Sequence, residues 1–301
     1  MKKVPTLIWS KTELIQETLL SYQPLLCAMK LPSGYITLEQ HYYLYKTVFL
    51  AAVLFNSQSW TNISKMEFNK LRIIQLKFLN RVMKVPKSTP NAFTYMELGV
   101  IPIKHEIQKR QLMFLHHILS LPNTDPVSRL YNQQKSFPYE KNWANTSQTL
   151  LEIYSLQECN IPEISKHQWK QMITSAVTSD AFNELSKECE SKTKTQKLTY
   201  ETLSAQKYLF LCPTDIASLI FKIRSRTLNC RDNQHSANPD TTCRLCGSEI
   251  EDQTHIINCT KVRCDGEIIS LKEYDKPNFE INLDLLQTIR SRYQNFLQQV
   301  K

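Results

Sequence analysis

The segment Cys243-Arg-Leu-Cys246-Gly-Ser-Glu-Ile-Glu-Asp-Gln-Thr-His255-Ile-Ile-Asn-Cys259 places three cysteines and one histidine within 17 residues. The Cys-x2-Cys pair supplies two thiolates from one tight turn, and the following Gly247 allows the backbone to reverse. Three residues separate His255 from Cys259, so a helix that begins just before His255 would place both on one face. This pattern is typical of a tetrahedral zinc site with Cys243, Cys246, His255 and Cys259 as ligands. The alternative interpretation is a set of buried, reduced thiols beside a core histidine.

The predicted ion has a structural role. Four protein ligands leave no open coordination position for water or substrate, so we expect one zinc ion that stabilises the fold and takes no part in catalysis.

The amino-acid composition limits the fold class, the kind of partner and the cellular compartment that can be expected. The chain has 301 residues, 42% of them hydrophobic, with only 4 Gly against 13 Pro, which favours long helices separated by proline-marked turns. The net charge of +9 favours a polyanionic partner, and nucleic acid fits better than a membrane. A generic basic protein is the alternative. Nine scattered cysteines indicate a reducing compartment, the nucleus or the cytoplasm, and no disulfide framework.

No segment suits a bilayer. The longest apolar stretch covers residues 48–55, and its extension toward Tyr42 includes Lys46. A membrane-spanning helix needs about 20 apolar residues. We therefore expect no transmembrane helix, and no secretory leader either, because Val4-Pro5 and Lys11 interrupt the first residues.

Apolar periodicity and capping signals predict a mainly α fold, with at most a small hairpin around the metal. Thr37 and Gln40 form a capping-box pattern, Gly99 suits a helix end, and Ser165 with Gln168 suggests a third cap. The expected helices cover 37–55, 62–85, 91–98, 102–119, 127–133, 146–157, 165–189 and 284–300, and another begins at Pro213-Thr-Asp215.

Basic side chains gather on several of these helices. On a helix ending before Pro86, four cations and no acid share one face beside an apolar stripe; they are Lys70, Lys77, Arg81 and Lys84. This face indicates either a ridge that contacts a polyanion or a merely solvated surface. Further predicted nucleic-acid contacts are Lys87, Lys104, Lys109, Arg110, Lys222, Arg224, Arg226 and Arg231. For the last four, the alternative is favourable charge near a helix C-terminus.

Several segments, taken in order, resemble the C-terminal part of the reverse transcriptase of non-LTR (LINE-type) retrotransposons. They are Ala52-Val-Leu-Phe-Asn56, Ser59-Trp60-Thr61, Leu76-Lys-Phe-Leu-Asn-Arg-Val-Met-Lys-Val-Pro-Lys-Ser-Thr-Pro-Asn91, Glu97-Leu-Gly-Val-Ile-Pro-Ile103, residues 110–117, Phe221-Lys-Ile-Arg-Ser-Arg226, and the Cys243 to Cys259 segment.

The resemblance implies a multi-helix thumb-like and linker bundle followed by a small zinc knuckle, which would grip template RNA and target DNA downstream of a polymerase palm. The expected organisation is a poorly defined segment at 1–36, a thumb-like domain at 37–121, a linker domain at 122–234, the knuckle at 235–265 and a C-terminal helical segment at 266–301.

The catalytic centre of that family is missing from this sequence. Two-metal polymerases hold their ions with adjacent aspartates, and no Asp-Asp pair occurs anywhere in the chain. We therefore expect no catalytic residue and no polymerase activity from the chain alone, and Met1 suggests a truncated element. The alternatives are a zinc-stapled protein–protein adaptor anchored by Trp60, Trp143 and Trp169, a decayed fragment without activity, and a subunit that works with a palm supplied separately.

Overall fold

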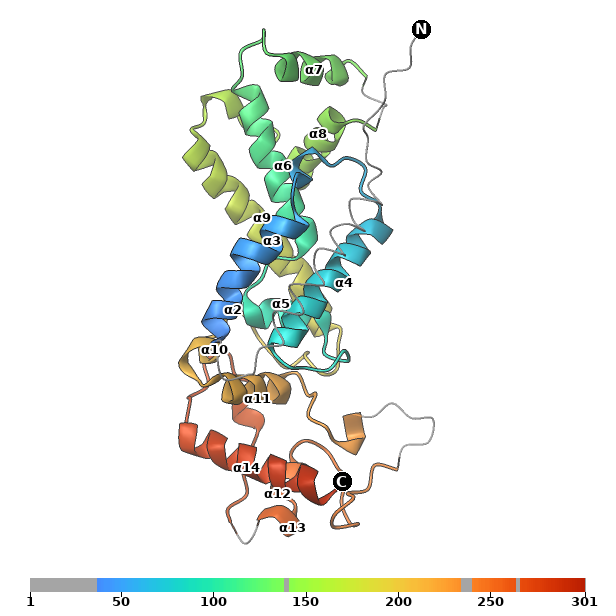
Figure 1. Ribbon diagram of the computed structural model, residues 1–301, viewed down its shortest axis with the longest axis vertical. Helices are drawn as coiled ribbons and strands as arrows, with labels where there is room; N and C mark the ends of the chain where they lie inside the picture. Colours follow the sequence, from blue (N-terminus) through green and yellow to red (C-terminus); the bar gives the residue numbers. More distant parts are fainter. Residues whose placement is uncertain (1–36, 138–140, 234–239, 264–265, 301) are drawn as a thin grey trace. The chain divides into compact units, whose positions relative to one another are not determined.

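The computed structural model describes residues 37–137, 141–233, 240–263 and 266–300 (Figure 1). These residues are mainly helical, and within these four ranges the only extended pairing is one antiparallel bridge between Thr242 and Ile250. The predicted mainly α class is therefore confirmed. No helix in the described ranges is long and apolar enough to cross a membrane. The predicted segment 1–36 lies outside the described residues.

The chain divides into two compact units. Unit 1 comprises Met1–Phe78 and Ile101–Ala181, and unit 2 comprises Leu79–Val100 and Phe182–Lys301. This division differs from the domains expected from the sequence, because residues 79–100 of the expected thumb-like domain belong with the C-terminal part of the chain.

The first helices begin and end close to their predicted positions. Helix α2 (Leu38–Leu44) continues through the π-helical turn η1 (Tyr45–Phe49) into α3 (Leu50–Val53), and η2 (Ser57–Ser59) follows. The Thr37 hydroxyl accepts from the Gln40 N–H at 3.2 Å, while the Gln40 side chain accepts from the Thr37 N–H at 2.8 Å. These reciprocal bonds satisfy two backbone donors, as expected of a capping box.

Helix α4 (Lys65–Val82) begins and ends differently from the prediction. Ser64 and Glu67 form its capping box, at 3.2 and 2.7 Å, so the helix begins later than the expected residue 62. At the other end Lys84 has φ 52°, and the N–H of Val85 donates to the carbonyl of Asn80 at 3.0 Å. This six-residue closure ends the helix. Lys84 therefore does not lie on the helical face that the sequence predicted.

Helices α5 (Asn91–Leu98) and α6 (Ile103–Leu119) follow as predicted. Gly99 has φ 59°, and a Cβ there would lie 2.1 Å from the backbone nitrogen of Ala205. Both the positive φ and the close approach require glycine at this helix end. Next come α7 (Pro126–Lys135), α8 (Trp143–Ile153), η3 (Ile161–Glu163) and α9 (Lys166–Glu190).

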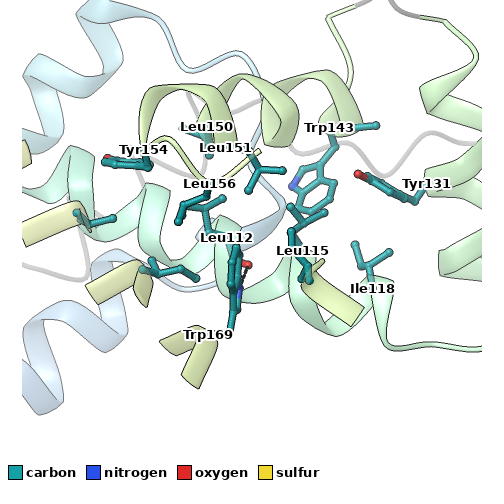
Figure 2. Close-up of a cluster of buried hydrophobic side chains, with 14 residues drawn as sticks. Leu112, Leu115, Ile118, Tyr131, Trp143, Leu150, Leu151, Tyr154, Leu156 and Trp169 are labelled. Atoms are coloured by element: carbon teal, nitrogen blue, oxygen red, sulfur yellow. Dashed lines mark hydrogen bonds between the residues drawn. The ribbon is translucent and has the colours of Figure 1, made fainter. Parts of the chain in front are cut away.

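The core of unit 1 forms where α6 packs against α7, α8 and η3. Figure 2 shows Trp169 and Trp143 among leucines of α6 and α8, with the dashed hydrogen bond from Trp169 Nε1 to the carbonyl of Leu112 at 3.0 Å. Trp169 is fully buried. Burying an indole of this size stabilises a fold by about 3–5 kcal/mol relative to alanine.

The described part of unit 2 packs short helices against α11 (Thr214–Arg224) and α14 (Leu283–Gln299). The short elements are α10 (Tyr208–Leu211), η4 (Arg231–Asn233), α12 (His255–Asn258), α13 (Thr260–Arg263) and η5 (Lys272–Asp275). Phe93 of α5 contacts Phe221 of α11 edge to face, with ring centroids 4.8 Å apart. Within this unit α12 and α13 both contact α14, so the cysteine segment is packed onto the C-terminal helix.

Candidate metal centre and basic side chains

The first two cysteines lie in a hairpin. The N–H of Cys243 donates to the carbonyl of Glu249, and that of Glu251 to the carbonyl of Thr241, both at 2.7 Å. Gly247, with φ 69°, reverses the chain, and its N–H donates to the carbonyl of Cys243 at 2.9 Å. The predicted small hairpin and the predicted role of Gly247 are both confirmed.

The four predicted ligands converge on one point. One ligand atom from each of Cys243, Cys246, His255 and Cys259 lies within 4.8 Å of all the others. The sulfurs of Cys243 and Cys259 are 4.0 Å apart, and the sulfur of Cys246 is 3.4 Å from Nε2 of His255. Metal–sulfur bonds of about 2.3 Å give a tetrahedron with edges of about 3.8 Å. The cluster can therefore hold a metal ion.

The second two ligands come from a different local structure. Helix α12 begins at His255, and Cys259 follows its last residue with φ −53° and ψ 130°, outside the helical region. The Asp252 carboxylate accepts from the N–H of His255 at 2.7 Å, which fixes the start of this short helix. The two side chains lie together although the helix ends before Cys259.

Neighbouring polar groups orient the ligands. The carboxylate of Glu249 lies 3.1 Å from Nδ1 of His255. A proton on Nδ1 shared with this carboxylate leaves the Nε2 lone pair directed at the metal position, an arrangement common around metal-bound histidines. The N–H of Leu245 donates to the Cys243 sulfur at 3.4 Å, and the Ser248 hydroxyl to the Cys246 sulfur at 3.3 Å. Such bonds stabilise negative charge on the sulfurs.

The thiols differ in acidity. Hydrogen bonds from Ser248 lower the pKa of Cys246 to about 6, whereas burial and the adjacent Cys243 raise the pKa of Cys259 to about 11. Metal binding requires thiolates, so a cation in the cluster must displace the proton of Cys259.

An ion pair within the hairpin holds Arg244, which in turn contacts α14. Glu251 is fully buried and accepts from the side chain of Arg244, the shortest contact being 2.6 Å. Burial opposes its ionisation, but the hydrogen bonds from Arg244 lower the pKa of Glu251 below its usual value. Arg244 lies 5.7 Å from the centre of the Phe296 ring, a cation–π contact with a buried residue of α14. None of these three residues was singled out from the sequence.

The predicted cations on and after α4 remain exposed. Lys70, Lys77 and Arg81 are exposed on the helix, and Lys84 and Lys87 are exposed in the loop that follows. In unit 2, burial and the charge of Lys84 lower the pKa of Lys222. Two ammonium groups are thus held close enough to interact.

Three of the arginines predicted to contact nucleic acid instead form ion pairs with carboxylates of unit 2. Arg224 is 0% exposed and pairs with Glu97 at 2.6 Å, so its prediction as a phosphate contact is wrong. Arg226 lies 3.5 Å from Asp275, and Arg231 binds Asp240 and the carbonyl of Thr242. Arg226 and Arg231 are both half-buried, and their ion pairs connect different segments of unit 2.

The predicted cations of α6 are half-buried. Arg110 donates to the carbonyl of Leu54 at 3.0 Å, and burial lowers its pKa, with Glu106 partly offsetting the effect. Lys109 and Arg110 line the same hollow of unit 1, and Lys104, which does not line it, also has an interaction partner.

Two of the three tryptophans proposed as partner anchors are unavailable. Trp143 and Trp169 belong to the core of unit 1, and Trp60 is half-buried. The adaptor alternative therefore loses its main anchors.

No family model, no curated protein and no solved structure matches this chain.

Proposed function

We propose that the chain binds nucleic acid through cations of unit 2, the unit that also holds a structural zinc site, and that it has no catalytic centre of its own. The resemblance of its segments to retrotransposon reverse transcriptases supports an origin in the region downstream of a palm, with template RNA or target DNA as the ligand.

The donors favour zinc as the ion. Three thiolates and one imidazole form a soft, four-coordinate set, which suits Zn²⁺ better than Mg²⁺ or Ca²⁺. The chain purified without added metal should contain one zinc per molecule by atomic absorption. Replacement by Co²⁺ should give the visible absorption bands of tetrahedral thiolate coordination. A chain without zinc, or a six-coordinate Co²⁺ spectrum, would refute this assignment.

The observation that carries the nucleic-acid proposal is the group of exposed cations Arg81, Lys84 and Lys87. Burial, and after it the charge of Lys84, also lowers the pKa of Lys222. Like charges held near one another destabilise a fold unless an anion is bound between or beside them. Within the described ranges neither ammonium has an ion-pair partner, and the same is true of Arg81 and Lys87. A phosphate backbone would neutralise these four cations, named here the unit 2 cations.

Binding should be measured by fluorescence anisotropy with duplex DNA, an RNA hairpin and an RNA–DNA hybrid between 50 and 300 mM salt. A plot of the logarithm of the association constant against the logarithm of the salt concentration should be linear. Its slope should be about −0.9 for each duplex phosphate that the protein contacts. The triple variant Arg81→Glu/Lys84→Glu/Lys87→Glu should lose most binding and reduce the slope by about three such contacts.

The matched control is Lys187→Glu/Lys192→Glu/Lys197→Glu, which changes the net charge equally at other exposed positions of unit 2. Equal losses in the two triple variants would show that only total charge matters. Unchanged affinity in the first variant would refute the proposed surface. The variant Lys70→Glu/Lys77→Glu tests separately whether the two α4 lysines of unit 1 contribute to nucleic-acid binding.

A further inference from the structure

Unit 1 contains a pocket that no part of the proposed zinc or unit 2 surface uses. It has a volume of about 440 Å³ and lies between η2, α6 and the first residue of α9. Pockets of about 300–1,000 Å³ are typical of small-molecule sites.

The wall of this pocket carries an excess of positive charge. Lys109, Arg110 and Lys166 line it, with Glu106 as the one carboxylate. Neither lysine forms an ion pair with any residue in the described ranges. Arg110 is anchored by its bond to the carbonyl of Leu54, and burial has removed part of its hydration. Three cations converging on one hollow suit a phosphate group.

A second wall is aromatic. Phe114 and His117 are stacked, with ring centroids 6.1 Å apart and planes inclined by 27°. Phe114 is held from behind by Trp143, edge to face at 5.4 Å, and Trp143 is seen within the core cluster of Figure 2. His117 is exposed, so one more planar ring can extend the stack.

We propose that this pocket binds a nucleoside phosphate, with the base stacked on the Phe114–His117 pair and the phosphate held by Lys109, Arg110 and Lys166. The Glu106 carboxylate accepts from ribose hydroxyls. The site lies in unit 1 and does not depend on the unit 2 cations.

Calorimetric titration of the zinc-loaded chain tests the combination of groups. AMP should bind at least tenfold more tightly than adenosine, which lacks the phosphate, and than ribose 5-phosphate, which lacks the base. Equal affinity for AMP and ribose 5-phosphate would overturn the stacking role. Equal affinity for AMP and adenosine would overturn the phosphate role, and no saturable binding of AMP or of a phosphorylated strand would overturn the site.

Variants locate the site. Lys109→Ala/Lys166→Ala should weaken AMP binding at least tenfold, whereas Lys170→Ala, exposed one turn further along α9, should leave it unchanged. His117→Ala should reduce the preference for AMP over ribose 5-phosphate and spare the affinity for the latter. All four positions are partly or fully exposed, so the variants fold. Unchanged AMP binding in the double lysine variant would overturn the proposal.

A free nucleotide and a strand end present the same chemistry. If a 5′-phosphorylated pentanucleotide binds more tightly than AMP and than the unphosphorylated strand, the site holds strand ends. If AMP binds more tightly, the site holds a free nucleotide. The Lys109→Ala/Lys166→Ala variant should lose this binding, whereas the triple variant Arg81→Glu/Lys84→Glu/Lys87→Glu should keep it. Nucleotide binding in the pocket of unit 1 is thereby tested independently of nucleic-acid binding by the unit 2 cations.

Discussion

Replacement of Arg224 by methionine should destabilise unit 2 strongly without affecting nucleic-acid binding. Arg224 and Glu97 are both 0% exposed, joined by bonds of 2.6 and 3.3 Å, and Arg224 also donates to the carbonyls of Tyr274 and Lys276. Removing the guanidinium leaves the Glu97 carboxylate buried without a cation, although the Tyr200 hydroxyl still donates to it at 2.7 Å. Losing one partner of a buried pair costs about 3–5 kcal/mol.

That cost is a large fraction of the total stability of about 5–15 kcal/mol expected for a domain. The double variant Glu97→Leu/Arg224→Met removes both charges and should lose less than the sum of the two single changes. Arg290→Met is the control, because Arg290 and its partner Asp215 are each more than 40% exposed. An exposed pair contributes at most about 1 kcal/mol.

Urea unfolding followed by circular dichroism gives the free energies. All tryptophans precede residue 182 and none occurs in 79–100, so tryptophan fluorescence reports on unit 1 alone and should keep its midpoint. A loss below about 1 kcal/mol in Arg224→Met, or strict additivity in the double variant, would refute the interpretation of a buried, mutually dependent pair.

Three other predictions concern the metal ligands and one turn. Glu249→Gln should weaken zinc binding by about 10–100-fold in a chelator competition, because it loses the carboxylate that orients His255; an unchanged affinity would contradict this. The pKa of Cys246 lies below its ordinary value of 9.0, at about 6, so its contribution to stability is present above pH 9 and is lost as pH falls through 6. Because protons compete with zinc for the thiolates, zinc content measured after dialysis should fall as the pH is lowered, and full retention at pH 4 would argue against thiolate ligation. Gly99→Ala should destabilise unit 2 by at least about 1 kcal/mol in thermal unfolding, because its Cβ would meet the backbone of Ala205 and its φ is positive; an unchanged melting temperature would disprove the close approach.

Local signals predicted much of this structure. The capping box at Thr37, the helix end at Gly99 and the ligands between Cys243 and Cys259 all depend on residues within one or a few turns of each other. Such features follow from backbone geometry and side-chain chemistry alone, so a single sequence suffices to find them.

Contacts between distant segments were not predicted. Arg224 pairs with Glu97, which lies 127 residues earlier, and no short-range pattern distinguishes it from the surface cations around it. Glu97 could have indicated such a contact, because it is the only acidic residue of the short, mainly apolar helix α5. Residues 92–98 of this helix are all buried. A carboxylate there requires a buried cation, but the sequence does not say which one. The membership of residues 79–100 in unit 2 was missed for the same reason.

The packing of the cysteine hairpin changes the expected effect of metal loss. From the sequence, loss of zinc in Cys243→Ser should melt residues 235–265 and leave the remaining helices folded. In unit 2, however, α12 and α13 contact α14, and Arg244 of the hairpin lies over Phe296. The hydroxyl of Tyr293 also accepts from the N–H of Asn229 at 2.9 Å. Helix α14 has 17 residues, and an isolated helix of about this length is only marginally stable in water.

We therefore expect metal loss to unfold α14 together with the hairpin. Hydrogen exchange of Cys243→Ser should show loss of amide protection in 241–263 and in 283–299, with retained protection in 166–181 and unchanged tryptophan fluorescence. Leu130→Ser, an exposed substitution on α7, is the control and should change none of these. Full protection of α14 in the metal-free variant would show that contacts with α11 alone hold it, and the zinc would then stabilise only its own loop.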